Sequence, residues 1–182
     1  MKYKKEYLNI LHQELKKAMG CTEPIAISYL SSCLKDLLDD IPSSVEIFVS
    51  GNILKNVKSV VVPNTKGLRG IKAASAIGII AGKKELVLEC ISKVKEEDII
   101  KCKDFLNNTE MSVKASDQGF VFDVHIFMYK DDNVVEGRIV DNHTNIVYLR
   151  KNDKVYVNRD LNNSFKVNDL EDHNLLNVKD IY

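Results

Sequence analysis

The residues of this chain best suited to chemistry lie in the sequence Met-Gly-Cys-Thr-Glu-Pro, which ends at Pro24. Gly20 is expected to end one helix, and Thr22 is expected to cap the next, with Glu23 in its first turn. Free backbone N–H groups and the helix dipole at such a position favour a thiolate at Cys21. That thiolate could act as a nucleophile, a redox group or a metal ligand. Alternatively, Cys21 is a small half-buried residue that fills the turn between two helices.

A second set of polar side chains follows an expected strand, in the loop 50–56. Loops at strand ends commonly carry recognition groups on a rigid scaffold. One hydroxyl, two amides and one ammonium would together suit a small molecule that bears a carboxylate. They belong to Ser50, Asn52, Asn56 and Lys55. The alternative is a solvated loop in which the asparagines occupy turn positions.

His143 and Thr144 come directly before another expected strand, where an imidazole could take part in catalysis or binding. The alternative for His143 is a surface histidine near a turn. His125 alternates with apolar neighbours, so it is expected on one face of a strand. The three other cysteines lie in apolar or helical segments and are expected to serve packing. They are Cys33, Cys90 and Cys102.

The elements that position these residues follow from the spacing of the apolar side chains. Spacings of three and four residues predict helices at 7–19, from Thr22 to a point before Pro42, and at 96–106. A run of small residues over 73–82 predicts a helix that packs closely on its neighbours. Alternating apolar residues predict a strand at 45–49, a short apolar run before Pro63 predicts another at 59–62, and the segment 84–91 fits either a strand or a helix.

From Met111 onward the apolar period changes to two. Helices first and strands last, without strict alternation, predict an α+β fold: N-terminal helices, a short mixed sheet with a small-residue helix, then a C-terminal antiparallel meander. We expect a single domain over 1–157 and a polar tail or linker over 158–182. The expected strands are 111–113, 121–129, 134–140, 146–149 and 154–157, with turns at 131–133 and 151–153.

The composition argues against several classes of partner. The chain has 182 residues with 26 basic and 26 acidic side chains, so its net charge is zero and nucleic acid is not an expected partner. The longest apolar run is far shorter than a membrane span, so no membrane partner is expected. No apolar segment follows the charged first residues, and no Cys-x-x-Cys pair occurs. We therefore expect a cytoplasmic protein with reduced thiols.

Four motifs together resemble the L-cysteine desulfidase family, which is related to the α chain of iron–sulfur L-serine dehydratases. Their order and approximate spacing match the N-terminal half of that family over most of this chain. The motifs are Gly20–Pro24, Ser50–Asn56, Val62–Thr65 with Gly67 and Gly70, and His143–Ile146.

The resemblance implies a cytoplasmic lyase that converts an amino acid, cysteine or serine, to pyruvate and ammonia by β-elimination. It implies a [4Fe–4S] cluster with three cysteine ligands, of which Cys21 would be one. The other two would lie in a C-terminal helical domain or partner subunit outside this sequence. The resemblance further implies that eight other residues bind the substrate. These are Thr22, Glu23, Ser50, Asn52, Lys55, Asn56, His143 and Thr144.

One thiolate does not hold a cluster that needs three or four. The chain alone is therefore expected to bind no cluster and to be inactive. It would be a part of a longer protein, one subunit of a split enzyme, or a relative that has lost the chemistry. Two other functions stay open: a stand-alone domain that binds an amino acid or regulates without catalysis, and a redox protein that uses Cys21. The redox function is disfavoured because no second cysteine that could form a disulfide with Cys21 lies nearby in the sequence.

Overall fold

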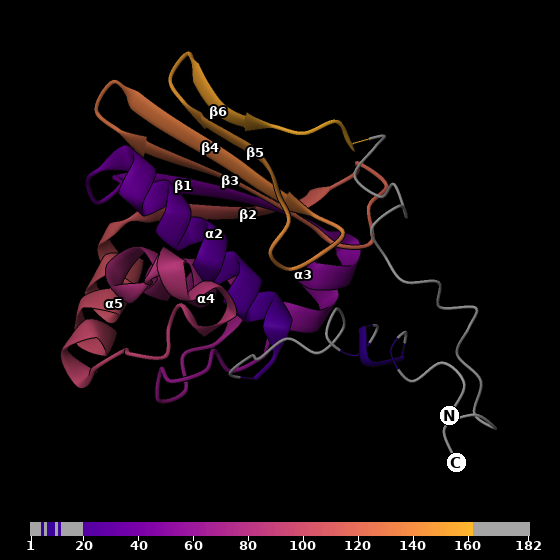
Figure 1. The fold of residues 1–182 in the computed structure, drawn as a ribbon. Coiled ribbons are helices and arrows are strands. Elements are labelled where there is room, and N and C mark those ends of the chain that lie inside the picture. Colours follow the sequence, from indigo (N-terminus) through magenta and orange to yellow (C-terminus); the bar gives the residue numbers. More distant parts are fainter. Residues whose placement is uncertain (1–4, 6, 10, 12–19, 162–182) are drawn as a thin grey trace. The chain divides into compact units, whose positions relative to one another are not determined.

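The computed structural model describes residues 5, 7–9, 11 and 20–161 (Figure 1). The chain divides into a compact unit, Ala18–Asp160, and a second unit made of Met1–Lys17 and Leu161–Tyr182. In the second unit the described residues 5, 7–9 and 11 are helical, as expected for the helix 7–19. The described residues do not include the later apolar positions of that expected helix, which are Leu15, Ala18 and Met19. They also do not include the tail from residue 162 onward. The division into a domain and a tail stays a prediction.

The compact unit combines helices with one six-stranded sheet, which confirms the α+β class. Its elements are α2 (Thr22–Leu38), β1 (Ser44–Ser50), α3 (Gly51–Val57), α4 (Gly70–Ala81), the 3₁₀ helix η1 (Lys84–Glu89), α5 (Glu96–Asn108), β2 (Glu110–Ser116), β3 (Asp123–Lys130), β4 (Asn133–Val140), β5 (Ile146–Lys151) and β6 (Lys154–Asn158).

The strands are ordered β2-β1-β3-β4-β5-β6. Strands β3 to β6 form the expected antiparallel meander, with tight turns at 131–132 and 152–153. Strand β2 is not part of that meander. It pairs in parallel with β1, from Ser44 opposite Glu110 to Ser50 opposite Ser116. A parallel pair needs a long crossover, and the segment from α3 to α5 supplies it.

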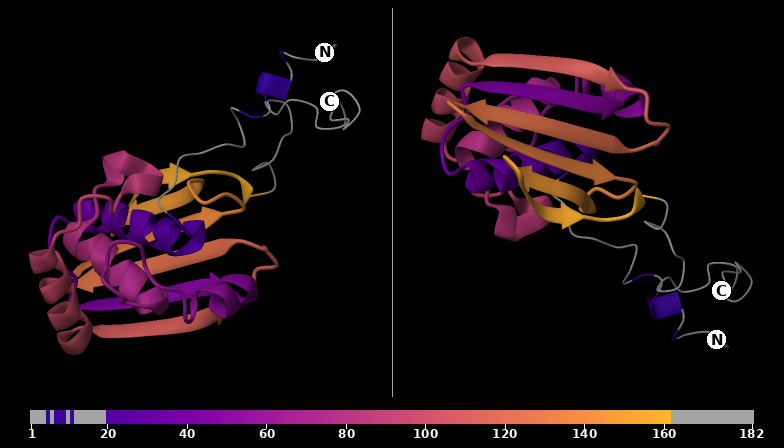
Figure 2. Two further views of the ribbon diagram at one scale, coloured as in Figure 1. Left: turned by 90° about the horizontal axis from the view of Figure 1, so that it is seen from below. Right: turned by 90° about the horizontal axis from the view of Figure 1, so that it is seen from above.

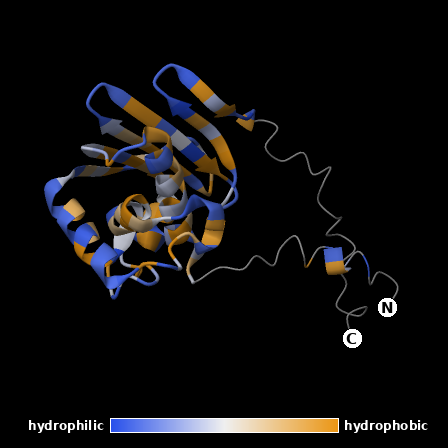
Figure 3. Ribbon diagram, turned by 60° about the vertical axis from the view of Figure 1, so that its left-hand side comes forward, coloured by the Kyte–Doolittle hydropathy of each residue, from blue (hydrophilic) through white to orange (hydrophobic). Residues whose placement is uncertain are grey.

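The helices cover one face of the sheet, and the other face carries no helix of the compact unit (Figure 2). Helix α2 packs on β3, β4 and β5 and on α4, which in turn packs on α5. On the helix side the strands present apolar residues such as Val45, Ile47 and Val49, all of them buried. Figure 3 shows the resulting alternation of hydrophobic and hydrophilic positions along the strands. Among the described residues, no helix has the length and apolar character needed to cross a membrane.

Helices α2 and α4 approach each other closely because their facing residues are small. A Cβ atom added at Gly78 would lie 2.3 Å from the backbone oxygen of Ser28. The Ser28 hydroxyl donates a hydrogen bond to the Ala74 carbonyl at 2.7 Å, and the hydroxyls of Ser31 and Ser75 are hydrogen-bonded at 2.9 Å. The small-residue helix predicted for 73–82 is therefore confirmed, and its role is to pack against α2.

Two local predictions are wrong. The segment expected to be a loop, 50–56, begins with the last residue of β1 and continues as helix α3. The Ser50 side chain caps this helix by accepting a hydrogen bond from the Ile53 N–H, and Ile53 and Val57 are buried four residues apart. The segment 59–62 is not a strand and makes only an isolated bridge between Val61 and Arg69. The ambiguous segment 84–91 contains η1.

Candidate functional site

A group of four polar residues, here named the α2 amino-terminal cluster, lies where helix α2 begins. It consists of Cys21, Thr22, Glu23 and His143. The Cys21 thiol donates a hydrogen bond to Glu23 Oε2 at 3.1 Å, and the Thr22 hydroxyl is hydrogen-bonded to His143 Nε2 at 3.0 Å. Thr22 also donates a longer hydrogen bond to Glu23 Oε2, at 3.5 Å. The cluster thus joins a thiol, a carboxylate and an imidazole through one hydroxyl.

The start of α2 differs from the expected one by one residue. Cys21, not Thr22, is the residue before the helix, and its side chain caps no backbone N–H. Thr22 is the first helical residue, so its hydroxyl is available to His143. Glu23 lies in the first turn as expected, where a carboxylate interacts favourably with the helix dipole.

His143 lies in the loop between β4 and β5 and is half-buried. Its ring packs on Phe122, with the two ring centroids 4.5 Å apart. The loop is fastened by Asn145, whose side-chain amide donates to the Val140 carbonyl at 3.1 Å. Thr144 donates a weak hydrogen bond to Asn142 within the same loop, at 3.4 Å. A ligand contact of Thr144 stays a prediction.

The charges in the cluster oppose a thiolate at Cys21. Burial and the hydrogen bond and negative charge of Glu23 raise the pKa of the Cys21 thiol. The same hydrogen bond, helped by the charge of His143, lowers the pKa of the Glu23 carboxyl, although burial acts in the opposite direction. The raised pKa of Cys21 therefore runs against the thiolate expected from the sequence. That expectation counted the helix dipole but left out the carboxylate two residues away.

The second predicted set of residues lies on and before α3. Ser50 is buried, and its hydroxyl donates to the Val121 carbonyl at 2.8 Å besides capping α3. The side chains of Asn52, Lys55 and Asn56 are exposed, and the Asn56 amide donates to Asn52 at 3.3 Å. Helix α3 contacts α2. Whether these residues share one ligand site with the α2 amino-terminal cluster stays a prediction.

The other cysteines are less accessible than Cys21, which is the only exposed one of the four. Burial raises the pKa of Cys33 to about 11 and the pKa values of Cys90 and Cys102 to about 12. Such shifts are typical of cysteines that serve packing. Within residues 20–161 and the few described residues before them, no three His, Cys, Asp or Glu side chains are placed to hold a metal ion.

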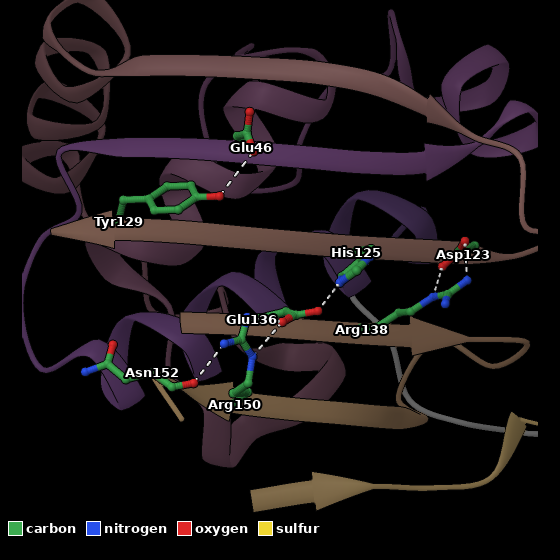
Figure 4. A network of polar contacts seen from close by, with 8 residues as sticks. All are labelled: Glu46, Asp123, His125, Tyr129, Glu136, Arg138, Arg150 and Asn152. Carbon is green, nitrogen blue, oxygen red and sulfur yellow. Dashed lines mark hydrogen bonds and ion pairs between the residues drawn. The ribbon is translucent and has the colours of Figure 1, made fainter. Parts of the chain in front are cut away.

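A network of polar side chains lies on the helix-free face of the sheet (Figure 4). The sequence analysis did not predict that these residues contact one another. Asp123 is buried and accepts two hydrogen bonds from Arg138, at 2.8 and 2.9 Å. Glu136 is hydrogen-bonded to His125 at 2.9 Å and accepts from Arg150 at 2.6 Å. Asp123 with His125 on β3, and Glu136 with Arg138 on β4, are each two positions apart, and this spacing is the signal that could have placed them on one face.

The chain is similar to bacterial UPF0597 proteins. It is 45% identical over 181 residues to the UPF0597 protein of Desulfitobacterium hafniense, and the match covers 99% of this chain and 42% of the relative. It is 42% identical over 180 residues to that of Finegoldia magna, covering 98% of this chain and 42% of the relative. It is 37% identical over 176 residues to the UPF0597 protein of Treponema denticola, and the match covers 97% of this chain and 41% of the relative. No family model matches the chain.

These comparisons correct the family assignment drawn from the four motifs. The three relatives carry the name UPF0597 protein, which states no activity, and none carries the name of an L-cysteine desulfidase or a serine dehydratase. The assignment to the L-cysteine desulfidase family is therefore not retained, and similarity to UPF0597 proteins replaces it. The chain spans less than half the length of these relatives.

Proposed function

We propose that the chain forms one part of the active site of a longer enzyme that carries out β-elimination on an amino acid, and that the α2 amino-terminal cluster is its contribution. The observation that carries this proposal is the hydrogen bond between Thr22 and His143, which holds an imidazole beside an exposed thiol and its carboxylate partner. The relatives are more than twice as long as the matched segment. The remaining groups of the site would lie outside this chain.

Each group of the cluster suits one part of an amino acid. Glu23, with its lowered pKa, would bind the α-ammonium group as a carboxylate. The backbone N–H groups at the start of α2 would bind the α-carboxylate. His143 would accept the proton that leaves Cα while the bond from Cβ to its sulfur or oxygen breaks. The sulfur or oxygen would leave with the electron pair of that bond, take up a proton from solvent, and be released as hydrogen sulfide or water. The enamine so formed gives pyruvate and ammonia on hydrolysis. Further substrate contacts would come from Ser50, Asn52, Lys55, Asn56 and Thr144.

The [4Fe–4S] cofactor expected from the motifs needs three or four thiolates. The described residues offer one exposed cysteine, so this part of the chain alone does not fit the cofactor. The roles given above therefore concern the chain's own groups. In the longer enzyme we propose Cys21 as one ligand of such a cluster. Its other ligands would come from a helical domain or partner subunit outside this chain.

The test is the formation of pyruvate and ammonia from L-cysteine and from L-serine. It compares the chain alone with the chain joined to the part of the Desulfitobacterium hafniense relative that lies outside the matched 181 residues. We expect product only from the joined protein, and a loss of about 100-fold in kcat/KM for Glu23→Gln and for His143→Gln.

The matched control is Glu97→Gln, which changes an exposed carboxylate on α5 and is expected to leave the activity unchanged. Activity that is indifferent to both Glu23 and His143 would contradict the proposed site. Binding of the amino acid by the joined protein without any product would contradict the lyase and favour the amino-acid-binding alternative.

A further inference from the structure

A second site lies on the helix-free face of the sheet, at the edge formed by β2. A hollow of about 430 Å³ opens there, which is within the range of small-molecule sites. It lies where β1 and β2 begin, whereas the α2 amino-terminal cluster neighbours the loop after β4. The residues that line it are Ser44, Val45, Glu46, Glu110, Ser112, Lys114 and Tyr129.

One carboxylate of the hollow is already held by its neighbours. Glu46 accepts hydrogen bonds from the Lys114 ammonium at 3.3 Å and from the Tyr129 hydroxyl at 3.2 Å, one on each carboxylate oxygen. The Lys114 ammonium also lies 5.4 Å from the centroid of the Phe48 ring. These contacts hold the Glu46 carboxylate in place and neutralise one of the two acidic groups of the hollow.

Two other polar groups of the hollow, both on β2, have no partner among the described residues. The Ser112 hydroxyl oxygen is shielded from water and has no hydrogen-bond partner. Glu110 lies two residues before it on the same face of β2, and its exposed carboxylate forms no ion pair with a described residue. A buried hydroxyl without a partner is uncommon, because it costs about 1–3 kcal/mol. Both groups accept hydrogen bonds, so both match a ligand that donates several.

We propose that this hollow binds a small molecule with a protonated primary amine. The ammonium group pairs with the Glu110 carboxylate and, once the Ser112 side chain turns toward the hollow, donates to the Ser112 hydroxyl, while the Tyr129 ring forms an apolar wall for the carbon chain. The net charge of the hollow is negative, since Glu46 and Glu110 outnumber Lys114. An anion is therefore disfavoured. This proposal does not depend on the proposed lyase function.

The test uses ethanolamine as the probe and follows backbone amide chemical shifts of the full chain by NMR. Ethylene glycol, which has the same length but no charge, and acetate serve as comparison ligands. We expect ethanolamine to shift the amides of 110–114 and Tyr129, and the comparison ligands to leave them unchanged. Glu110→Gln should weaken the apparent affinity at least fivefold, and Ser112→Ala should weaken it by a smaller factor.

The matched control is again Glu97→Gln, whose carboxylate lies on α5 and is expected to have no effect. Thermal unfolding of each variant shows whether it is folded. The proposal is overturned if ethanolamine shifts no amide of the hollow, if ethylene glycol shifts the same amides equally, or if folded Glu110→Gln binds ethanolamine as the unchanged chain does.

Discussion

The Thr22 hydroxyl and the His143 imidazole are hydrogen-bonded at 3.0 Å, although 121 positions separate them in the sequence. The bond ties the first turn of α2 to the loop between β4 and β5. It therefore aligns the two segments that carry the thiol, carboxylate and imidazole of the α2 amino-terminal cluster.

A double-mutant cycle measures this bond directly. Thr22→Val and His143→Gln should show a coupling in the free energy of unfolding of about 1 kcal/mol, the usual net worth of one hydrogen bond. Unfolding in urea gives the four stabilities. His143→Gln combined with Thr109→Val, at the end of α5, is the control and should be additive. An additive Thr22 and His143 pair would show that the bond is not formed in solution.

Cys21 should react with iodoacetamide before the other three cysteines, yet more slowly than a free cysteine at pH 8. It is the exposed thiol, and its raised pKa leaves a smaller thiolate fraction at any pH below that pKa. Glu23→Gln removes one cause of the raised pKa and should increase the rate by a factor on the order of 3. Mass spectrometry identifies the alkylated residue and its rate. Earlier reaction of Cys33 or Cys102 would refute the assignment.

Gly78→Ala should destabilise the compact unit by about 3 kcal/mol. The new methyl group would meet backbone atoms of Ser28, which cannot turn aside as a side chain can, so α2 and α4 must separate. Gly51→Ala is the control, because nothing lies within 4 Å of its added Cβ. Urea unfolding gives the free energy of unfolding of both variants. Equal values for Gly78→Ala and Gly51→Ala would contradict the close packing of α2 and α4.

Asp123→Ala should lower the free energy of unfolding by about 3 to 5 kcal/mol. The Arg138 side chain is mostly buried, and the substitution removes its charged partner. Asp123→Ala with Arg138→Met removes both charges and should recover much of that loss. The free energies of unfolding of the single and double variants test this. A double variant as unstable as the single one would show that the packing of Asp123, rather than its charge pair, matters.

The helices α2 and α5 and the strands β3 to β6 could be predicted because local periodicity determines them, and α4 could be predicted from its run of small residues. Their apolar residues recur with the period of the element, and short Asn- and Asp-containing turns join the strands. Helix α3 was missed because it has only seven residues, too few for its buried positions Ile53 and Val57 to show a helical period. The parallel pairing of β2 with β1 depends on a crossover of three α-helices and the 3₁₀ helix η1, and no local pattern encodes that choice of neighbour.

The candidate site could be predicted only in part for the same reason. Cys21 and Glu23 are neighbours in sequence, so their position at the start of α2 was predictable. The contact of His143 with Thr22 depends on how the β4–β5 loop meets α2, and Phe122, which packs on His143, gave no signal of its own. The raised pKa of Cys21 follows from the orientation of the Glu23 side chain, which spacing alone does not determine.

An NMR titration of the chain with L-serine, followed through the backbone amides, tests whether the α2 amino-terminal cluster receives an amino acid. We expect shifts at Cys21, Thr22, Glu23 and His143, at least tenfold weaker apparent binding for Glu23→Gln, and unchanged binding for Glu97→Gln. Shifts confined to other parts of the chain, no shifts at all, or equal binding by folded Glu23→Gln would contradict the claim that this cluster receives an amino acid.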